Sequence, residues 1–166
     1  VCKTNTTRPD AFTSPHGALG RVSARGVVWQ RELCTRHTVT SPFDITRIDA
    51  LPRVESVLTR PDYPLEALAA LRDAGAQGLV HVGPGDGNIP TRISEWIASE
   101  AGRGLVVVRA SRVSGGFVTR NGALSDDRLG TIASGAHDAP KARLLLALAL
   151  GRATDRARIQ RYFDEC

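Results

Sequence analysis

From residue 53 onward, short hydrophobic runs alternate with amphipathic segments. Three short segments predict strands, at 54–58, 79–82 and 105–108. Two segments with apolar residues at helical spacing predict helices, at 64–74 and 90–101. The third strand is apolar at every position, as expected of a strand that is covered on both faces. This alternation predicts a small α/β domain over residues 53–166, with a parallel sheet between two layers of helices and its post-strand loops on one edge.

The last third of the chain predicts a long loop followed by two more helices. Residues 111–127 are rich in Ser, Gly, Arg and Asp, so a solvated loop with charged turns is the simplest interpretation. A short β-like piece follows at 132–135. Asp138 is well placed to cap a helix at 139–150, and Thr154 to cap a final helix that ends at Phe163.

The first 52 residues follow a different pattern. Two β-prone runs, at 19–23 and 27–30, flank Ala24-Arg25-Gly26 and predict a hairpin. An isolated hairpin is marginally stable in water, so residues 1–30 are expected to need a larger partner sheet outside this chain. The sequence is accordingly expected to start, at Val1, in the middle of a structural element. Residues 31–52 have no sustained periodicity and indicate a linker.

Composition and charge narrow the function classes. A chain of 166 residues is long enough for a real core. The net charge is +5, but the arginines are scattered without a basic block or interleaved aromatics, which argues against nucleic acid as a partner. The longest apolar run, at 144–150, is too short to span a membrane. The three cysteines and four histidines show no disulfide framework or metal-ligand spacing, so no cofactor is expected and the compartment stays open.

The segment Gly83-Pro84-Gly85-Asp86-Gly87-Asn88 is the strongest candidate for a ligand site. It follows a predicted strand and precedes a predicted helix, the position at which open α/β sheets bind ligands. Its glycines allow the backbone to approach a ligand closely, and Asn88 offers an amide that donates and accepts. The pattern is not a P-loop, because no Lys-Ser/Thr pair follows. The simpler alternative is a tight turn with Asn88 as a local helix cap.

Taken together, the motifs resemble the carboxyl-terminal half of bacterial type II L-asparaginases, a class that includes the glutaminase-asparaginases. The matching segments occur in family order along the whole chain. They are Lys3-Thr4-Asn5-Thr6-Thr7, Gly17-Ala18-Leu19-Gly20, Pro42-Phe43-Asp44, Leu51-Pro52, Gly85-Asp86-Gly87-Asn88, Arg109-Ala110-Ser111-Arg112-Val113, Ala133-Ser134-Gly135 and Lys141-Ala142-Arg143.

The resemblance implies a hydrolase that releases ammonia from L-asparagine, with L-glutamine as a second candidate substrate. It implies that residues 1–30 end a large amino-terminal α/β domain, that 31–52 link the domains, and that 53–166 form a smaller domain with a Rossmann- or flavodoxin-like parallel sheet. It also implies a homotetramer, a dimer of dimers, with each site shared between neighbouring subunits. Type II members suggest a periplasmic or secreted protein.

Two site residues carry over from the family. Lys3 matches the lysine that assists a threonine nucleophile, and a desolvated lysine can accept a hydroxyl proton. The alternative for Lys3 is a solvated lysine at a strand end. Asn88 matches the asparagine that reaches the neighbour's site and helps to hold the substrate's α-amino end.

Two departures from the family pattern affect the expected chemistry. The family's threonine signatures lie upstream of the matching region, so this chain alone is expected to be inactive. Ala123 stands where many type II members have a glutamate that pairs with the substrate's ammonium; Asp126 and Asp127 are the nearby carboxylates that could compensate. Two other hypotheses stay open: a non-catalytic module that binds a small ligand or partner at the glycine loop, and a nucleotide-binding α/β domain, although no phosphate-cradling loop is found.

Overall fold

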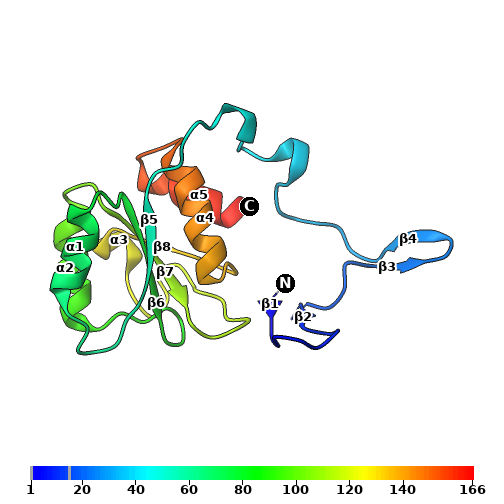
Figure 1. The fold of residues 1–166 in the computed structure, drawn as a ribbon, viewed down its shortest axis with the longest axis horizontal. Helices are drawn as coiled ribbons and strands as arrows, with labels where there is room; N and C mark the ends of the chain where they lie inside the picture. Colours follow the sequence, from blue (N-terminus) through cyan, green and yellow to red (C-terminus); the bar gives the residue numbers. More distant parts are fainter. Residues whose placement is uncertain (1, 15) are drawn as a thin grey trace.

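The computed structural model describes residues 2–14 and 16–166, so Val1 and its predicted place in mid-element lie outside it. Its main body is a parallel sheet with strand order β5-β6-β7-β8 (Figure 1). The strands are β5 Val54–Leu58, β6 Gly78–Gly83, β7 Val106–Ser111 and β8 Thr131–Ala133. The helices are α1 Leu65–Asp73, α2 Thr91–Ala101, α3 Asp126–Leu129, α4 Ala139–Leu150 and α5 Arg156–Glu165. The predicted α/β class is confirmed.

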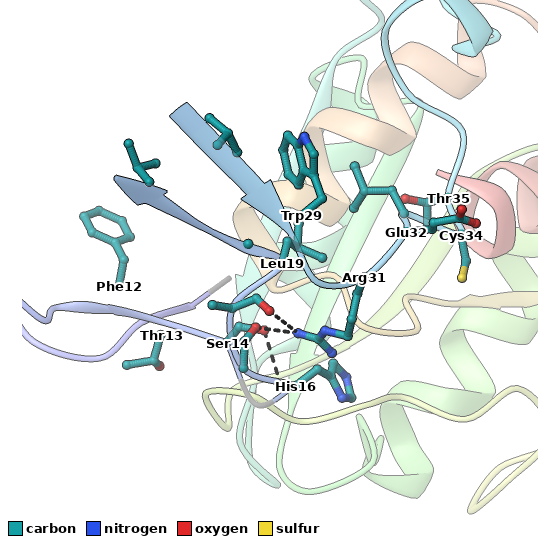
Figure 2. A pocket seen from close by; sticks show the side chains of 16 residues that line it. Phe12, Thr13, Ser14, His16, Leu19, Trp29, Arg31, Glu32, Cys34 and Thr35 are labelled. Atoms are coloured by element: carbon teal, nitrogen blue, oxygen red, sulfur yellow. Dashed lines mark hydrogen bonds between the residues drawn. The ribbon is translucent and has the colours of Figure 1, made fainter. Parts of the chain in front are cut away.

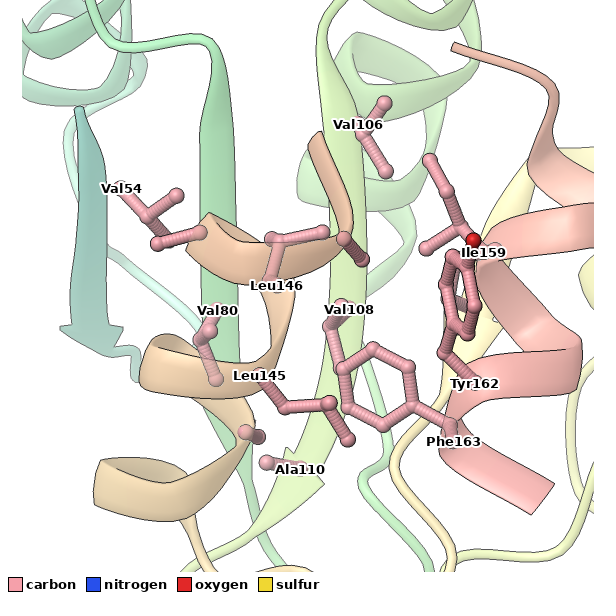
Figure 3. Packing of buried hydrophobic residues seen from close by; sticks show 14 of the residues in the cluster. Val54, Val80, Val106, Val108, Ala110, Leu145, Leu146, Ile159, Tyr162 and Phe163 are labelled. Carbon is pink, nitrogen blue, oxygen red and sulfur yellow. The ribbon is translucent and has the colours of Figure 1, made fainter. Parts of the chain in front are cut away.

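Helices cover both faces of the sheet, as the alternation predicted. Helices α1 and α2 pack on one face, and α4 and α5 pack on the other (Figure 1). Because side chains alternate along a strand, Leu79 of β6 joins the α1–α2 core while Val80 joins the α4–α5 core. Figure 3 shows the second core, where Leu145, Leu146 and Phe163 close over the valines of the sheet. Within the described residues, no helix is long and apolar enough to cross a membrane.

The third strand differs from its prediction at both ends. It begins at Val106 and continues to Ser111, past the predicted end at 108. Arg109 interrupts the apolar run in sequence but does not end the strand, because its neighbour β6 continues in register beside it, with His81 opposite Arg109 and Gly83 opposite Ser111. Arg109 is therefore a buried charged residue in the middle of a strand.

The two carboxyl-terminal helices are capped by aspartates. Asp138 begins α4 as predicted, with its carboxylate accepting from the Lys141 backbone N–H at 3.1 Å. The prediction that Thr154 caps the last helix is wrong. Asp155 is the cap, because its carboxylate accepts from the Arg158 N–H at 2.8 Å while the helix begins at Arg156 and continues to Glu165.

The amino-terminal segment forms small antiparallel ladders that stand apart from the α/β body (Figure 1). Strand β1, Cys2–Lys3, pairs with β2, Phe12–Thr13; strand β3, Gly20–Ser23, pairs with β4, Gly26–Trp29. The predicted hairpin is confirmed. Its apolar side chains are nevertheless exposed, with Val22 at 85% and Trp29 at 68%.

Residues 31–52, the predicted linker, are irregular but contact the α/β body. Residues 31–52 contain only the short 3-10 helices Thr38–Thr40 and Ile45–Arg47 among their regular elements. The Arg36 N–H donates to the Glu165 carbonyl at 2.6 Å, and the Phe43 ring packs on Tyr162 with ring centres 5.0 Å apart. These contacts hold this irregular segment against α5.

A buried histidine links β6 to the end of β5. His81 Nε2 lies 2.6 Å from the Thr59 hydroxyl oxygen, and both residues are buried. Burial disfavours the imidazolium and lowers the pKa of His81 to about 4. In an unfolded chain the pKa of a histidine is about 6.5. The native protein thus holds His81 neutral over a pH range in which the unfolded chain takes up a proton.

His81 should therefore make the chain sensitive to acid. Above about pH 6.5, His81 should have no effect on how the free energy of unfolding depends on pH. As the pH falls from about 6.5 to 4, protonation of His81 in the unfolded chain should lower the free energy of unfolding by at most roughly 3 kcal/mol. Urea denaturation at several pH values measures this loss. A His81→Gln variant should lose less stability than the parent across that window. Parallel pH profiles for parent and variant would show that His81 is not the source.

Candidate functional site

The glycine loop 83–88 lies at the carboxyl end of β6, and its first glycine has no room for a side chain. A Cβ on Gly83 would meet the backbone oxygen of Asn88 and would lie 3.0 Å from the His81 ring. Gly85 and Gly87 have φ of +54° and +67°, the left-handed region that glycine adopts without strain. The glycines are thus required by the loop's compact path, which carries the chain from β6 towards α2.

Asn88 is exposed at the end of this loop. Its backbone N–H donates to the Pro84 carbonyl at 2.9 Å, but no hydrogen bond of its side chain is seen within residues 2–14 and 16–166. The alternative that Asn88 caps the following helix is wrong, because α2 begins at Thr91 with Pro90 in the capping position. The structure therefore leaves the Asn88 amide, with its donor and acceptor groups, at the surface of the loop.

A buried ion pair contacts the backbone of the 83–88 loop. Arg109 and Asp126 are 0% and 1% exposed, and the guanidinium donates to both carboxylate oxygens at 2.7 Å. Arg109 Nη1 also donates to the Asp86 carbonyl at 2.7 Å, and Nη2 to the Thr119 carbonyl at 3.0 Å. One side chain thus connects the 83–88 loop, the loop after β7 and the start of α3.

The surroundings of Asp126 favour its charged form. Burial raises the pKa of this carboxyl, but hydrogen bonds from Arg109, from the Thr131 hydroxyl and from the Asn121 N–H outweigh burial and lower the pKa overall. The prediction of a solvated loop at 111–127 is therefore wrong at Asp126. Ser111 is also nearly buried, and its hydroxyl donates to the Gly85 carbonyl at 2.6 Å.

Lys3 lies elsewhere in the chain, on the short strand β1. Its side chain is exposed, and Nζ is 5.6 Å from the centre of the Phe12 ring. Within the described residues no hydrogen bond or ion pair joins Lys3 to the glycine loop. The two sequence-predicted residues are thus presented by different parts of the molecule.

Comparison with known protein families identifies the α/β body. The family model described as "Glutaminase/Asparaginase C-terminal domain" matches residues 53–163, which is the parallel sheet and its helices. The chain belongs to the glutaminase/asparaginase family. The resemblance to the carboxyl-terminal half of type II asparaginases is thereby confirmed.

Relatives of this asparaginase-family chain match it from end to end. It is 39% identical to the "Probable L-asparaginase periplasmic" of Haemophilus influenzae and 37% identical to "L-asparaginase 2" of Escherichia coli, each over 99% of this chain and 48% of the relative. It is 37% identical to the "Glutaminase-asparaginase" of Pseudomonas aeruginosa, over 95% of this chain and 44% of the relative. The chain spans about half the length of the curated relatives it matches.

The carboxylates near Ala123 are already engaged in this asparaginase domain. Asp126 is paired with Arg109, and Asp127 accepts from Arg120 and from the Asn121 amide, each at 2.8 Å. Both carboxylates are thus already held by partners inside this domain, which disfavours either as a replacement for a glutamate at position 123. A different carboxylate, Asp86, accepts from the Ala123 N–H at 3.1 Å and was missed from the sequence because it looked like an ordinary turn residue.

A large apolar hollow of about 890 Å³ lies on the asparaginase chain's amino-terminal segment, not at the glycine loop (Figure 2). Phe12, Leu19 and Trp29 line it. Arg31 also lines it and donates hydrogen bonds to the Gly17 and Ala18 carbonyls. It includes neither Lys3 nor Asn88. Its apolar lining has the character of a contact surface.

The Arg109–Asp126 pair should dominate the stability of the site region. Asp126→Ala leaves a buried guanidinium without its counter-charge, so the free energy of unfolding should fall by about 3–5 kcal/mol. Asp127→Ala removes an exposed partner of Arg120 and should cost less than about 1 kcal/mol. Urea denaturation of both variants provides the comparison. Equal losses would contradict the supporting role assigned to the buried pair.

Proposed function

We propose that the complete protein containing this chain is an asparaginase-type amidohydrolase that hydrolyses L-asparagine to L-aspartate and ammonia. L-glutamine is a second candidate substrate. The observation that carries the proposal is the end-to-end similarity to relatives named L-asparaginases and glutaminase-asparaginases. The nucleophile of this mechanism is a threonine upstream of the chain described here.

In this proposal Lys3 assists the threonine by accepting its hydroxyl proton, directly or through another group. A lysine can act in this way only when it is neutral, and removal of its ammonium group from water favours the neutral form. The exposed Lys3 ammonium has no carboxylate partner within the described residues, so packing of the upstream domain against β1 would desolvate it.

Asn88 is proposed to hold the substrate's α-amino end in the site of a neighbouring subunit. Its free, exposed amide and its rigidly supported loop suit contact with a ligand held by another chain. This arrangement requires a homo-oligomer, for which we propose a dimer of dimers with sites shared between subunits.

The amino-terminal segment is proposed to complete the upstream domain. Residues 1–30 would form its tail, residues 31–52 the linker and residues 53–166 the carboxyl-terminal domain. Two features support this division: the exposed apolar side chains of β3 and β4, and the apolar hollow beside them. A periplasmic or secreted location is proposed from the name of the Haemophilus influenzae relative.

A non-catalytic module that retains the fold is the second candidate. The observation that favours it is Ala123, which places a methyl group where many type II members carry a glutamate. Such a module would bind a small ligand or partner at the 83–88 loop without hydrolysing it.

Ammonia release from L-asparagine by the full-length protein tests the two candidates. The full-length protein should hydrolyse L-asparagine, and the 166-residue chain alone should release no measurable ammonia, because it lacks the nucleophile. A full-length protein that binds L-asparagine without releasing ammonia would favour the non-catalytic module. Turnover by the purified 166-residue chain would contradict the upstream threonine.

Lys3→Met in the full-length protein should leave folding intact and lower kcat roughly 10²- to 10⁴-fold, the range of general-base assistance. Lys3→Arg should be similarly slow, because arginine keeps the positive charge but cannot accept the proton at neutral pH. Steady-state kinetics and circular dichroism measure both effects. Near-parental kcat in Lys3→Met would make the lysine a bystander, and recovery in Lys3→Arg would show that it acts only as a cation.

Asn88→Ala should raise KM for L-asparagine. Loss of a hydrogen bond to the charged α-amino group costs about 1.5–3 kcal/mol, or roughly 10- to 150-fold. If sites are shared, subunits carrying Asn88→Ala mixed with subunits lacking the nucleophile should recover activity, because some hybrid sites combine two intact halves. No recovery after verified subunit exchange would mean that each site is built within one subunit.

A further inference from the structure

Asp86 joins two loops that the proposed function places at the same end of the substrate. Its Oδ1 accepts from the Thr119 N–H at 2.7 Å, and its Oδ2 accepts from the Ala123 N–H at 3.1 Å. Asp86 is two residues from Asn88, so a single carboxylate ties the Asn88 loop to the segment that ends at Ala123.

Both the backbone carbonyl and the carboxylate of Asp86 accept hydrogen bonds. Its backbone carbonyl accepts from Arg109 Nη1, while its carboxylate spans the two N–H groups of the facing loop. Arg109 in turn donates to the Thr119 carbonyl. Asp86 and Arg109 thus form a closed set of contacts between the two loops, and neither loop can shift without breaking one of them.

The two hydrogen bonds that Asp86 accepts from the facing loop, called the joint below, require a carboxylate. Two backbone N–H groups point at it, and neither has another acceptor within the described residues. An asparagine at position 86 would supply one acceptor and turn an NH2 group towards the other N–H. That replacement would leave donor facing donor and open the joint on one side.

The facing loop is shaped to admit the carboxylate. A Cβ on Gly122 would lie 2.8 Å from Asp86 Oδ2 and 3.0 Å from the Thr119 Cβ. Gly122 therefore provides the space that brings Asp86 within reach of both N–H groups. An alanine at position 122 would push the carboxylate away while keeping its charge.

We propose that Asp86 is a positioning residue that holds segments 83–88 and 119–123 as one unit, so that Asn88 and residue 123 face the substrate's α-amino end together. This proposal rests on the proposed function for the identity of the ligand. Asp86 acts through Asn88 and through the position of the facing loop, and not by touching the ligand.

The experiment uses the full-length protein with the variants Asp86→Asn and Gly122→Ala. Both should raise KM for L-asparagine about 5- to 30-fold, since each leaves a joint with unsatisfied hydrogen bonds, while kcat stays within about threefold. In an Asn88→Ala background, Asp86→Asn should raise KM by a smaller factor than it does in the parent background, because one of the two contacts through which Asp86 acts has already been removed.

Hydrogen exchange at the backbone amides of Thr119 and Ala123 gives a measurement that is independent of activity. Exchange should accelerate in Asp86→Asn and in Gly122→Ala. Asp127→Asn is the matched control, because it alters a carboxylate of the same region that contacts Arg120 and Asn121 rather than the 83–88 loop. The control should keep parental exchange and parental KM.

The outcomes separate the alternatives. An active enzyme in which Asp86→Asn changes neither KM nor exchange overturns the positioning role and leaves the proposed function standing. A raised KM in Asp86→Asn with parental behaviour in Gly122→Ala overturns it in favour of direct contact between the Asp86 charge and the ligand. A full-length protein without ammonia release overturns the proposed function instead, and exchange at Thr119 and Ala123 then still decides whether Asp86 joins the loops.

Discussion

The buried Arg109–Asp126 ion pair is the interaction on which the geometry of the site depends. Removing two charges from water is costly, and the cost is offset only when attraction is close and the remaining donors are satisfied. Here the guanidinium uses Nε, Nη1 and Nη2 on Asp126, the Asp86 carbonyl and the Thr119 carbonyl. The same contacts that compensate for burial therefore fix the two loops above β7.

The sheet and its helices were largely predictable because their signals are local. Short apolar runs predicted most of β6 and half of β7, and the carboxylate of Asp138 predicted where α4 begins. Errors arose where a nearby polar group competed. Asp155 rather than Thr154 caps α5, and Arg109 continues a strand that its charge seemed to end.

The site was less predictable because its contacts join residues far apart in sequence. Arg109 meets Asp126 across 17 positions, and Asp86 meets Ala123 across 37 positions. No periodicity reports such pairs. Lys3 and the role of Asn88 came instead from family resemblance, and both roles in the complete protein remain proposals. The two residues lie on different parts of the chain, Lys3 on β1 and Asn88 at the end of the glycine loop.

The most direct test of the proposed shared site is a crystal structure of the full-length protein with L-aspartate bound. We expect the ligand's α-amino group within hydrogen-bond distance of Asn88 from one subunit, and Lys3 of the other subunit beside the threonine nucleophile. Asp86 should still accept from the N–H groups of Thr119 and Ala123. A ligand enclosed by a single subunit, with Asn88 facing solvent, would contradict the shared site and the role of the glycine loop.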